Sequence, residues 1–273
     1  MTELLNEALL SEILDIAIDA GKEILDVYEN EFDVEIKGDG SPLTMADQHA
    51  HNLIEHRLGK LETVIPVLSE ESSGKVFEKR RNWQRFWLVD PLDGTKEFVK
   101  RNGEFTVNIA LIENGMPILG VVHTPVRAIS HYAALGLGAF RCEANGEVNP
   151  IHVRKSTREV MTMVASRSHA GADVEKYQKN LEKDAGEVQV TNMGSSLKIC
   201  LVAEGKADIY PRLGPTSEWD TAAAHCVLMV AGGKMVDITG KPLEYNKQNI
   251  LNPWFLACGD PEIDWVQYVE VGA

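Results

Sequence analysis

Acidic residues occur at three places where the chain is expected to turn. Glu70 and Glu71 follow a short extended segment, the run DPLDGT at 90–95 follows a strand candidate, and Asp220 lies in the first turn of a helix expected over 218–231. Each occurrence has an ordinary explanation, because paired glutamates are usually solvated, Asp-Pro and Asp-Gly form turns, and an aspartate complements the dipole at a helix start. Together, the three places indicate a site for divalent cations.

The run at 90–95 has residue types that suit both a metal and a phosphate. Pro91 fixes its own φ angle and is expected to end the preceding strand, which leaves the Leu92 carbonyl free. The same turn places Asp90 and Asp93 on one side of a tight loop. Hard oxygen donors without a nearby His or Cys favour Mg²⁺ or Mn²⁺. Residues 93–95 lead into 96–98, where free backbone amides at the start of a short helix could also hold a phosphate.

Basic residues of the second half stand at the ends of expected strands and the starts of expected helices. Arg167 and His169 follow one strand, Arg212 follows another, and Lys198 stands three residues after Ser195 at a helix start. Loops of this kind collect ligands in α/β sheets. Ser195 and helix amides could hold a phosphate that is not cleaved, with charge-assisted bonds from Lys198 and Arg212. The alternatives are a solvated helix face for Lys198 and a turn cap for His169.

The composition permits a large core and argues against a nucleic-acid polymer as partner. The chain has 273 residues, of which 44% are hydrophobic, and 27 basic against 41 acidic side chains give a net charge of −14. An acidic surface repels polyanions at long range. A small anionic ligand therefore requires cations that are concentrated locally.

The cysteines and the N-terminal segment indicate an intracellular protein. Cys142, Cys200, Cys226 and Cys258 form no Cys-x-x-Cys pair and are expected to pack as small hydrophobic residues in a reducing compartment. The N-terminal segment carries acidic residues throughout its apolar run and lacks the features of an export signal. No run approaches the roughly 18 apolar residues of a transmembrane helix. We expect a cytoplasmic protein, and peripheral attachment to the cytoplasmic side of the inner membrane stays open.

The expected elements divide the chain into two parts. The first part, 1–150, has amphipathic helices followed by an antiparallel meander, expected at 3–29, 44–60, 85–90, 105–113, 117–123 and 129–135. The second part, 151–273, alternates strands and helices, expected at 160–165, 173–183, 187–191, 195–204, 207–210 and 218–231. The sequence therefore predicts an α+β domain that carries most of the acidic residues and an α/β domain that carries Asp220 and the basic residues.

Three separated motifs resemble the signature of the inositol monophosphatase superfamily, whose members are magnesium-dependent, lithium-sensitive phosphatases. They are Glu70-Glu71, WLVDPLDGT at 87–95 and WDTAA at 219–223. Further motifs resemble the bacterial 3′(2′),5′-bisphosphate nucleotidases of that superfamily, namely DGTKEF at 93–98, VASRSH at 164–169, GSSLK at 194–198 and YPR at 210–212. The resemblance covers nearly the whole chain and implies a layered αβαβα sandwich.

The resemblance also implies a metal centre with two or three Mg²⁺ ions, which Mn²⁺ can replace. By this pattern Glu70, Asp90 and the Leu92 carbonyl hold one ion, and Asp90, Asp93 and Asp220 hold a second. Catalysis is assigned to Glu70 and Thr95, which activate the attacking water, and to Asp47, which supports the Thr95 hydroxyl. For Asp47 the alternative is a solvated helix face, and Glu71 is left as a supporting group.

The substrate that the resemblance implies is a nucleotide with two phosphates. Its contacts are expected from Glu70, Leu92, Asp93, Gly94, Thr95, His169, Ser195, Lys198, Arg212 and Asp220. The expected reaction converts adenosine 3′,5′-bisphosphate, and its phosphosulfate analogue, to the 5′-nucleotide and phosphate, as sulfur assimilation requires. The alternatives are an inositol monophosphatase, a fructose-1,6-bisphosphatase-like sugar phosphatase, and a non-catalytic sensor of magnesium or nucleotide. Relatives include dimers, but a monomer is favoured here.

Overall fold

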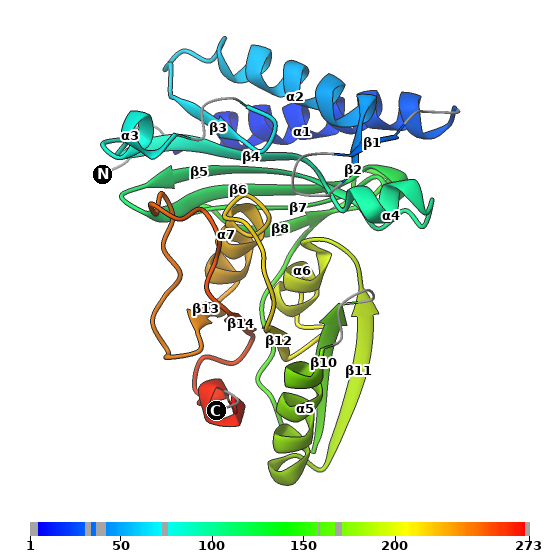
Figure 1. Ribbon diagram of the computed structural model, residues 1–273, viewed down its shortest axis with the longest axis vertical. Coiled ribbons are helices and arrows are strands. Elements are labelled where there is room, and N and C mark those ends of the chain that lie inside the picture. Colours follow the sequence, from blue (N-terminus) through cyan, green and yellow to red (C-terminus); the bar gives the residue numbers. More distant parts are fainter. Residues whose placement is uncertain are drawn as a thin grey trace.

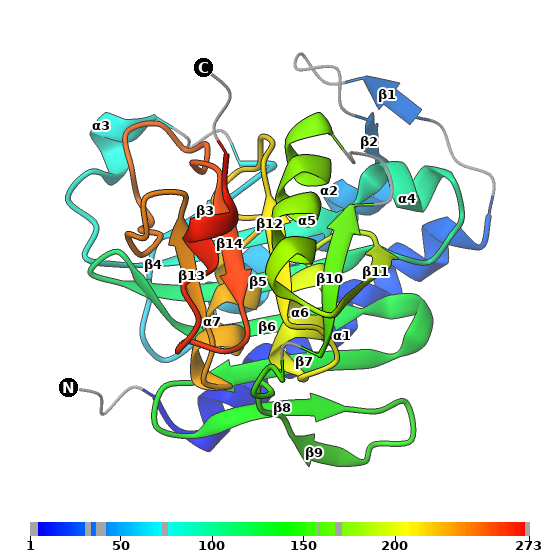
Figure 2. The ribbon, with the colours of Figure 1, turned by 90° about the horizontal axis from the view of Figure 1, so that it is seen from below.

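The described chain forms five alternating layers of helix and sheet (Figure 1). The computed structural model describes residues 5–30, 34–36, 42–72, 76–157, 159–166 and 171–270. Helices α1 and α2 cover one face of a seven-stranded sheet, α6 and α7 lie between that sheet and a five-stranded sheet, and α5 lies on the far face of the second sheet (Figure 2). This arrangement confirms the predicted layered αβαβα fold.

The helices have the following bounds. They are α1 (Glu7–Tyr28), α2 (Met45–Leu58), α3 (Phe77–Arg80), α4 (Thr95–Val99), α5 (Ala172–Asp184), α6 (Leu197–Ala203) and α7 (Ala222–Val230), with the short 3₁₀ helices η1 (Pro125–Arg127) and η2 (Trp265–Tyr268). The first helix matches its prediction, because it buries one apolar face against the sheet, formed by Leu10, Ile13, Ile16, Ala17, Ala20 and Ile24. Its N-terminus is capped by Asn6, whose side chain accepts a hydrogen bond from the Leu9 amide at 2.8 Å.

The seven-stranded sheet holds most of the acidic motif. Its strands, in spatial order, are β3 (Val67–Ser69), β4 (Arg85–Asp93), β5 (Thr106–Glu113), β6 (Met116–Thr124), β7 (Ile129–Ala134), β8 (Gly138–Cys142) and β9 (Val148–Pro150). The pair β3–β4 is parallel and the remaining pairs are antiparallel. Phe86 and Leu88 of β4 point to the core between the sheets, whereas Trp87 and Val89 point to the α1–α2 layer. Both faces are covered, which explains why β4 and β5 read as continuous apolar runs.

The five-stranded sheet is only partly the expected α/β unit. Its spatial order is β11 (Glu187–Met193), β10 (Val160–Ser166), β12 (Ile209–Arg212), β14 (Phe255–Cys258) and β13 (Lys234–Asp237). Strand β10 pairs in parallel with β11 and β12, as the alternation predicts. The sequence prediction missed β13 and β14, which pair antiparallel. A separate short pair, β1 (Val34–Ile36) with β2 (Pro42–Thr44), was also missed.

One hydrophobic cluster joins the two sheets. It contains side chains from both halves of the chain, among them Leu88, Val122, Val164, Tyr210 and Val227. The two sheets share this core. The division into two domains at residue 150 stays a prediction.

Burial also bears on the cysteines and on the membrane prediction. All four cysteines are free, and Cys200, Cys226 and Cys258 are buried, as expected of small hydrophobic residues. Among the described residues no helix is long and apolar enough to cross a membrane.

The close approach of α7 to β6 makes Gly120 a stability determinant. A Cβ atom at Gly120 would lie 2.3 Å from the Ala223 carbonyl oxygen and 2.8 Å from Cys226 Cβ. Because both neighbours are in a packed helix, we expect Gly120→Ala to lower the free energy of unfolding by roughly 1–3 kcal/mol, measured by urea denaturation. Gly214→Ala is the control, because a Cβ atom placed on Gly214 would have no neighbour within 4 Å. An unchanged stability for Gly120→Ala would show that the two elements can separate without cost.

Candidate active site

A bulge in β4 places the first two aspartates. Asp90 pairs with Asn108 and Asp93 pairs with Thr106, so three steps along β4 oppose two steps along β5. The prediction that Pro91 ends the strand was wrong, because a bulge accommodates a residue without an N–H group and the strand continues to Asp93. Asp90 Oδ1 accepts a hydrogen bond from the Leu92 amide at 3.1 Å, which closes the turn.

Glu70 and Asp220 reach the same place from other elements. Glu70 follows β3, and its amide donates to the Val89 carbonyl at 3.0 Å, so β4 positions it directly beside Asp90. Asp220 lies in the turn before α7, where its Oδ2 accepts a hydrogen bond from the Ser217 amide at 2.8 Å. The expected helix starts later than predicted, at Ala222, because residues 217–221 form turns instead.

Carboxylate oxygens of Glu70, Asp90 and Asp220 all lie within 4.8 Å of one another. They line a hollow of about 420 Å³ whose wall also includes Leu92, Asp93, Gly94 and Thr95. Burial, reinforced by the neighbouring carboxylates, raises the pKa of Asp90 and of Asp220 well above the usual value. Such a set of crowded hard oxygen donors, with no His or Cys among the lining residues, fits a divalent cation that would offset the repulsion.

Asp93 faces both this hollow and the basic residues. Its Oδ2 accepts hydrogen bonds from the Ser196 amide at 2.6 Å and from Asn108 Nδ2 at 3.4 Å. Burial raises its pKa, and the charge of Lys198 partly opposes that rise. Asp93 is not in the group of carboxylates that lie within 4.8 Å of one another, which joins Asp220 to Glu70 and Asp90. The expected division of these residues between two ions stays a prediction.

Asp47 is buried rather than solvated. Its Oδ2 accepts hydrogen bonds from the amide and the hydroxyl of Thr44, both at 2.8 Å, which caps α2. Its charge also contributes to the raised pKa of Asp90, which places it near the acidic group. The Thr95 hydroxyl donates to the Leu92 carbonyl at 3.4 Å. The predicted support of Thr95 by Asp47 stays a prediction, and the alternative of a solvated helix face was wrong.

The basic residues line a second, adjoining hollow of about 130 Å³. Its wall includes Asp93, Ser195, Lys198, Arg212 and Asp220, so it shares residues with the first hollow. Lys198 is buried, contrary to the alternative of a solvated face, and its Nζ donates to the Ser195 carbonyl at 2.5 Å. Burial lowers the pKa of Lys198 to about 8, with Asp93 opposing and Arg212 adding to the shift.

Ser195 holds an unusual backbone conformation at this wall. Its φ angle of 46° lies in the left-handed region, which side chains other than glycine seldom occupy. Gly94 faces it with a φ angle of 93°, and a Cβ atom there would lie 3.3 Å from Ser195 Cβ. Arg212 donates to the Pro215 carbonyl at 2.7 Å. His169 and Arg167 lie outside the described residues.

Sequence reasoning missed two polar residues of β5 that contact Ser195, Ser196 and Asp93. The Thr106 hydroxyl lies 3.0 Å from the Ser195 hydroxyl and 2.9 Å from the Ser196 hydroxyl. Asn108 Oδ1 accepts from the Ser196 hydroxyl at 2.9 Å. The signal that could have found them was two polar residues at alternate positions of an otherwise apolar strand, TVNIALIE, which puts both on one face.

Replacing Asp90 by asparagine should stabilise the protein in the absence of divalent ions. Because the pKa of Asp90 is raised on folding, folding takes up a proton, and this contribution to stability is lost as the pH rises above about 4. Asparagine cannot ionise, so the variant does not lose this stability as the pH rises. Thermal unfolding in EDTA should give Asp90→Asn a Tm at least about 3 °C above the unchanged protein at pH 8, with a smaller difference at pH 5. A lower Tm for the variant at pH 8 would mean that the carboxylate is compensated within the protein.

Comparison with known proteins identifies the family. The model of the inositol monophosphatase family matches residues 5–256. The chain is 50% identical over 250 residues to the 3′(2′),5′-bisphosphate nucleotidase CysQ of Escherichia coli (strain K12), covering 90% of this chain and 98% of that protein. The crystal structure of CysQ from Bacteroides thetaiotaomicron has a TM-score of 0.85 and 42% identity, and the match covers 95% of this chain and 100% of that one. The chain therefore belongs to the inositol monophosphatase family.

Proposed function

We propose that the protein is a 3′(2′),5′-bisphosphate nucleotidase that hydrolyses adenosine 3′,5′-bisphosphate to AMP and phosphate. The observation that carries this proposal is the acidic group of Glu70, Asp90 and Asp220 directly beside a hollow lined by Lys198 and Arg212. With divalent ions bound, the acidic group suits the phosphate that is cleaved. The charged side chains of Lys198 and Arg212 suit a phosphate that is kept. Relatives that bear the nucleotidase name at 50% identity support the same assignment.

The metal ions in this proposal are Mg²⁺, two or three per site, with Mn²⁺ as a substitute. The residues that would hold them are Glu70, Asp90, Asp93, Asp220 and the carbonyl of Leu92. When bound, such ions neutralise the charge of the phosphate and lower the pKa of a bound water. The fit rests on the donor set, which consists of carboxylates with a main-chain carbonyl beside them.

The chain's own residues then orient the water and the scissile phosphate. A carboxylate oxygen of Glu70 accepts a proton from the attacking water, and the Thr95 hydroxyl fixes the direction of that water. Asp47 supports this part of the site through the cap of α2, which packs against β2 and β4. Gly94 lets the main chain approach Ser195 closely, and the amides at 94–96 face the phosphate.

The second phosphate is assigned to Ser195, Lys198 and Arg212. Lys198 and Arg212 supply charge-assisted hydrogen bonds, which are stronger than neutral ones. Lys198 can lose its contact with the Ser195 carbonyl to a phosphate oxygen without moving far, because both residues line the same wall. A contact from His169 to the base or ribose stays a prediction, since His169 is outside the described residues.

The inositol monophosphatase and sugar phosphatase alternatives use the same acidic residues. Inositol monophosphate carries a single phosphate, and it would leave Lys198 and Arg212 without a second phosphate to bind. The nucleotide is therefore a better match to the second hollow than inositol monophosphate, and the substrate panel separates it from fructose 1,6-bisphosphate. We further propose a monomeric enzyme that acts in the cytoplasm on a by-product of sulfur assimilation and also accepts the phosphosulfate analogue.

A substrate panel tests the proposal. Phosphate release should be fastest from adenosine 3′,5′-bisphosphate when it is compared with inositol 1-phosphate and fructose 1,6-bisphosphate, and it should require Mg²⁺ and fall with Li⁺. Asp90→Asn should lose more than about 100-fold in kcat, because even partners of metal ligands are worth 10–100-fold. A preference for either sugar substrate would refute the nucleotide assignment. Tight nucleotide binding without phosphate release would favour the sensor.

Removing Arg212 tests the role of the second phosphate. Arg212→Ala should lower kcat/KM for adenosine 3′,5′-bisphosphate by roughly 10- to 100-fold, the value of a charge-assisted hydrogen bond. The rate with a mononucleotide such as 3′-AMP should change much less, because it has no phosphate at that place. Equal losses for both substrates, measured by steady-state kinetics, would assign Arg212 a structural role through its bond to Pro215.

A further inference from the structure

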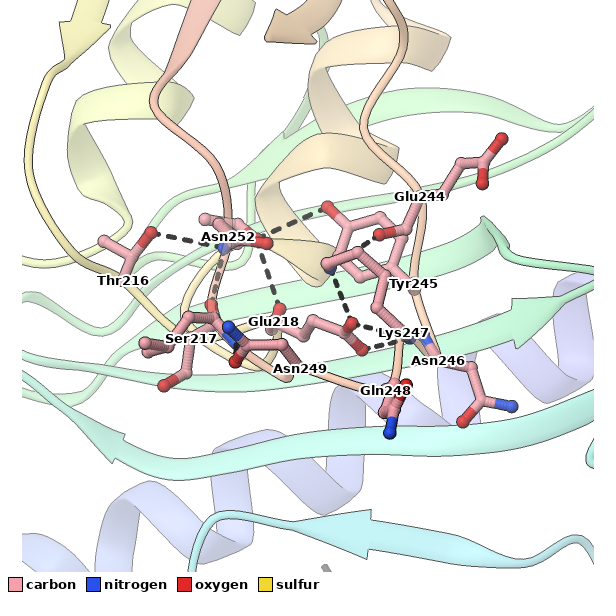
Figure 3. Close-up of polar contacts among 12 residues, drawn as sticks. Thr216, Ser217, Glu218, Glu244, Tyr245, Asn246, Lys247, Gln248, Asn249 and Asn252 are labelled. Atoms are coloured by element: carbon pink, nitrogen blue, oxygen red, sulfur yellow. Dashed lines mark hydrogen bonds and ion pairs between the residues drawn. The ribbon is translucent and has the colours of Figure 1, made fainter. Parts of the chain in front are cut away.

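A polar network around Glu218 fastens the turn that carries Asp220, and Figure 3 shows its contacts. The Glu218 side chain is completely buried. Its carboxylate accepts hydrogen bonds from the main-chain amides of Asn246 at 2.7 Å and Lys247 at 2.9 Å, and from Lys247 Nζ at 2.6 Å. A side chain two residues from Asp220 thus binds a segment about thirty residues further along the chain.

Asn252 closes the same turn from the other side (Figure 3). Its amide donates to the Thr216 carbonyl at 2.8 Å. Its Nδ2 donates to the Ser217 carbonyl at 2.7 Å and approaches the Thr221 hydroxyl at 3.0 Å. Ser217 in turn donates its amide to Asp220 Oδ2, so both ends of the turn are fixed around this carboxylate.

The segment that holds Glu218 is itself fixed to the first half of the chain. Arg80 is buried, and its Nη1 donates to Asn246 Oδ1 at 2.8 Å. Asn246 Nδ2 donates to the carbonyls of Arg80 at 3.0 Å and Trp83 at 3.3 Å. Residues 80–83 directly precede β4, the strand that carries Asp90. A continuous chain of hydrogen bonds therefore runs from the start of β4 to the Asp220 turn.

A buried carboxylate is a costly way to gain stability, because well-packed apolar residues of similar volume often do as well. Charged groups in such networks instead fix geometry. Geometry matters at this place, because Asp220 must stay beside two carboxylates of like charge. We propose that Glu218, in a network that also includes Asn246, Asn252 and Arg80, is a positioning residue that holds Asp220 against Glu70 and Asp90 for metal binding.

This Glu218 network acts on the metal site of the proposed function, so the test measures binding of Mg²⁺ or Mn²⁺ alone, by titration calorimetry on the whole protein. Glu218→Gln keeps the volume but replaces one acceptor by a donor that faces the amides at 246–247. It should weaken metal binding by about 10- to 100-fold, the usual effect of losing a partner of a metal ligand. In turnover the metal concentration for half-maximal rate should rise by a similar factor, whereas kcat at saturating metal should largely recover.

A second variant covers the case in which Glu218→Gln does not fold. Asn246→Gly removes the side-chain bonds to Arg80 and Trp83 but keeps the amide that donates to Glu218. Glycine suits the φ angle of 70° at this position, so the backbone is not strained. This variant should also weaken metal binding, by about tenfold. Unchanged metal affinity in either folded variant would overturn the proposal.

Asp208→Asn is the matched control. Asp208 is likewise completely buried and accepts hydrogen bonds from Arg154 Nε at 2.9 Å, the Ser156 hydroxyl at 2.7 Å and the Thr162 amide at 2.6 Å. It lines neither hollow, so Asp208→Asn should lower Tm but leave metal affinity unchanged. An equal loss of affinity in this control would show that destabilisation alone accounts for the effect, and would overturn the proposal.

Failure of the nucleotidase assignment is separable from failure of this inference. If the unchanged protein binds metal, and Glu218→Gln binds it more weakly, the positioning role stands even if no nucleotide is hydrolysed. If the unchanged protein hydrolyses adenosine 3′,5′-bisphosphate and Glu218→Gln binds metal normally, the nucleotidase assignment stands and the positioning role falls. A protein that binds neither ion overturns both.

Discussion

The mutual repulsion of three crowded carboxylates, of which Asp90 is buried and the other two are partly buried, is the constraint on which the rest of the structure depends. Glu70, Asp90 and Asp220 bring oxygens within 4.8 Å of one another, in surroundings that raise the pKa of the two aspartates. Left to themselves, such groups would separate or take up protons. The fold opposes this by mounting two of them on paired strands and the third on a turn tied by hydrogen bonds. A rigid frame of this kind is what a cation site of fixed geometry requires.

The layered architecture explains how residues about 150 positions apart meet. Glu70 directly follows β3 and Asp90 lies within the parallel neighbour β4, one position beyond the Ser69–Val89 pair, so one sheet fixes them relative to each other. Asp220 comes from the second half, and its turn leads into α7, which packs against β5 and β6 of the same sheet. Strand β12 brings Arg212 to the same place from the second sheet. The helix layer between the two sheets thus brings the acidic and the basic residues together.

Sequence reasoning succeeded where the determinants are local and failed where they depend on distant contacts. The apolar spacing at 3–29 predicted α1, and the acidic motifs pointed to Glu70, Asp90 and Asp220, which the structure brings together. Their roles as metal ligands stay predictions. Pro91 was misjudged, because only the register of β5 against β4 shows that a bulge absorbs it. The start of α7 was placed early, because the Glu218 carboxylate binds amides at 246–247 and the turn replaces a helical start. The residue types near 218 do not indicate that Glu218 will bind a segment as distant in the sequence as 246–247.

Lys198 also shows the difference between local and distant determinants, because the sequence left open whether it lies on a solvated helix face or in a binding site. A lysine on a helix is normally solvated, and only the tertiary structure buries Lys198 against Tyr210, with Nζ 5.5 Å from the ring centre. Burial lowers the pKa of Lys198, and the negative charge of Asp93 offsets part of that decrease. Asp93 therefore helps to keep Lys198 charged in the adjoining hollow, while the Ser196 amide and Asn108 hold Asp93 in place. A protein with a net charge of −14 can in this way keep a buried lysine charged, because a neighbouring carboxylate offsets the effect of burial.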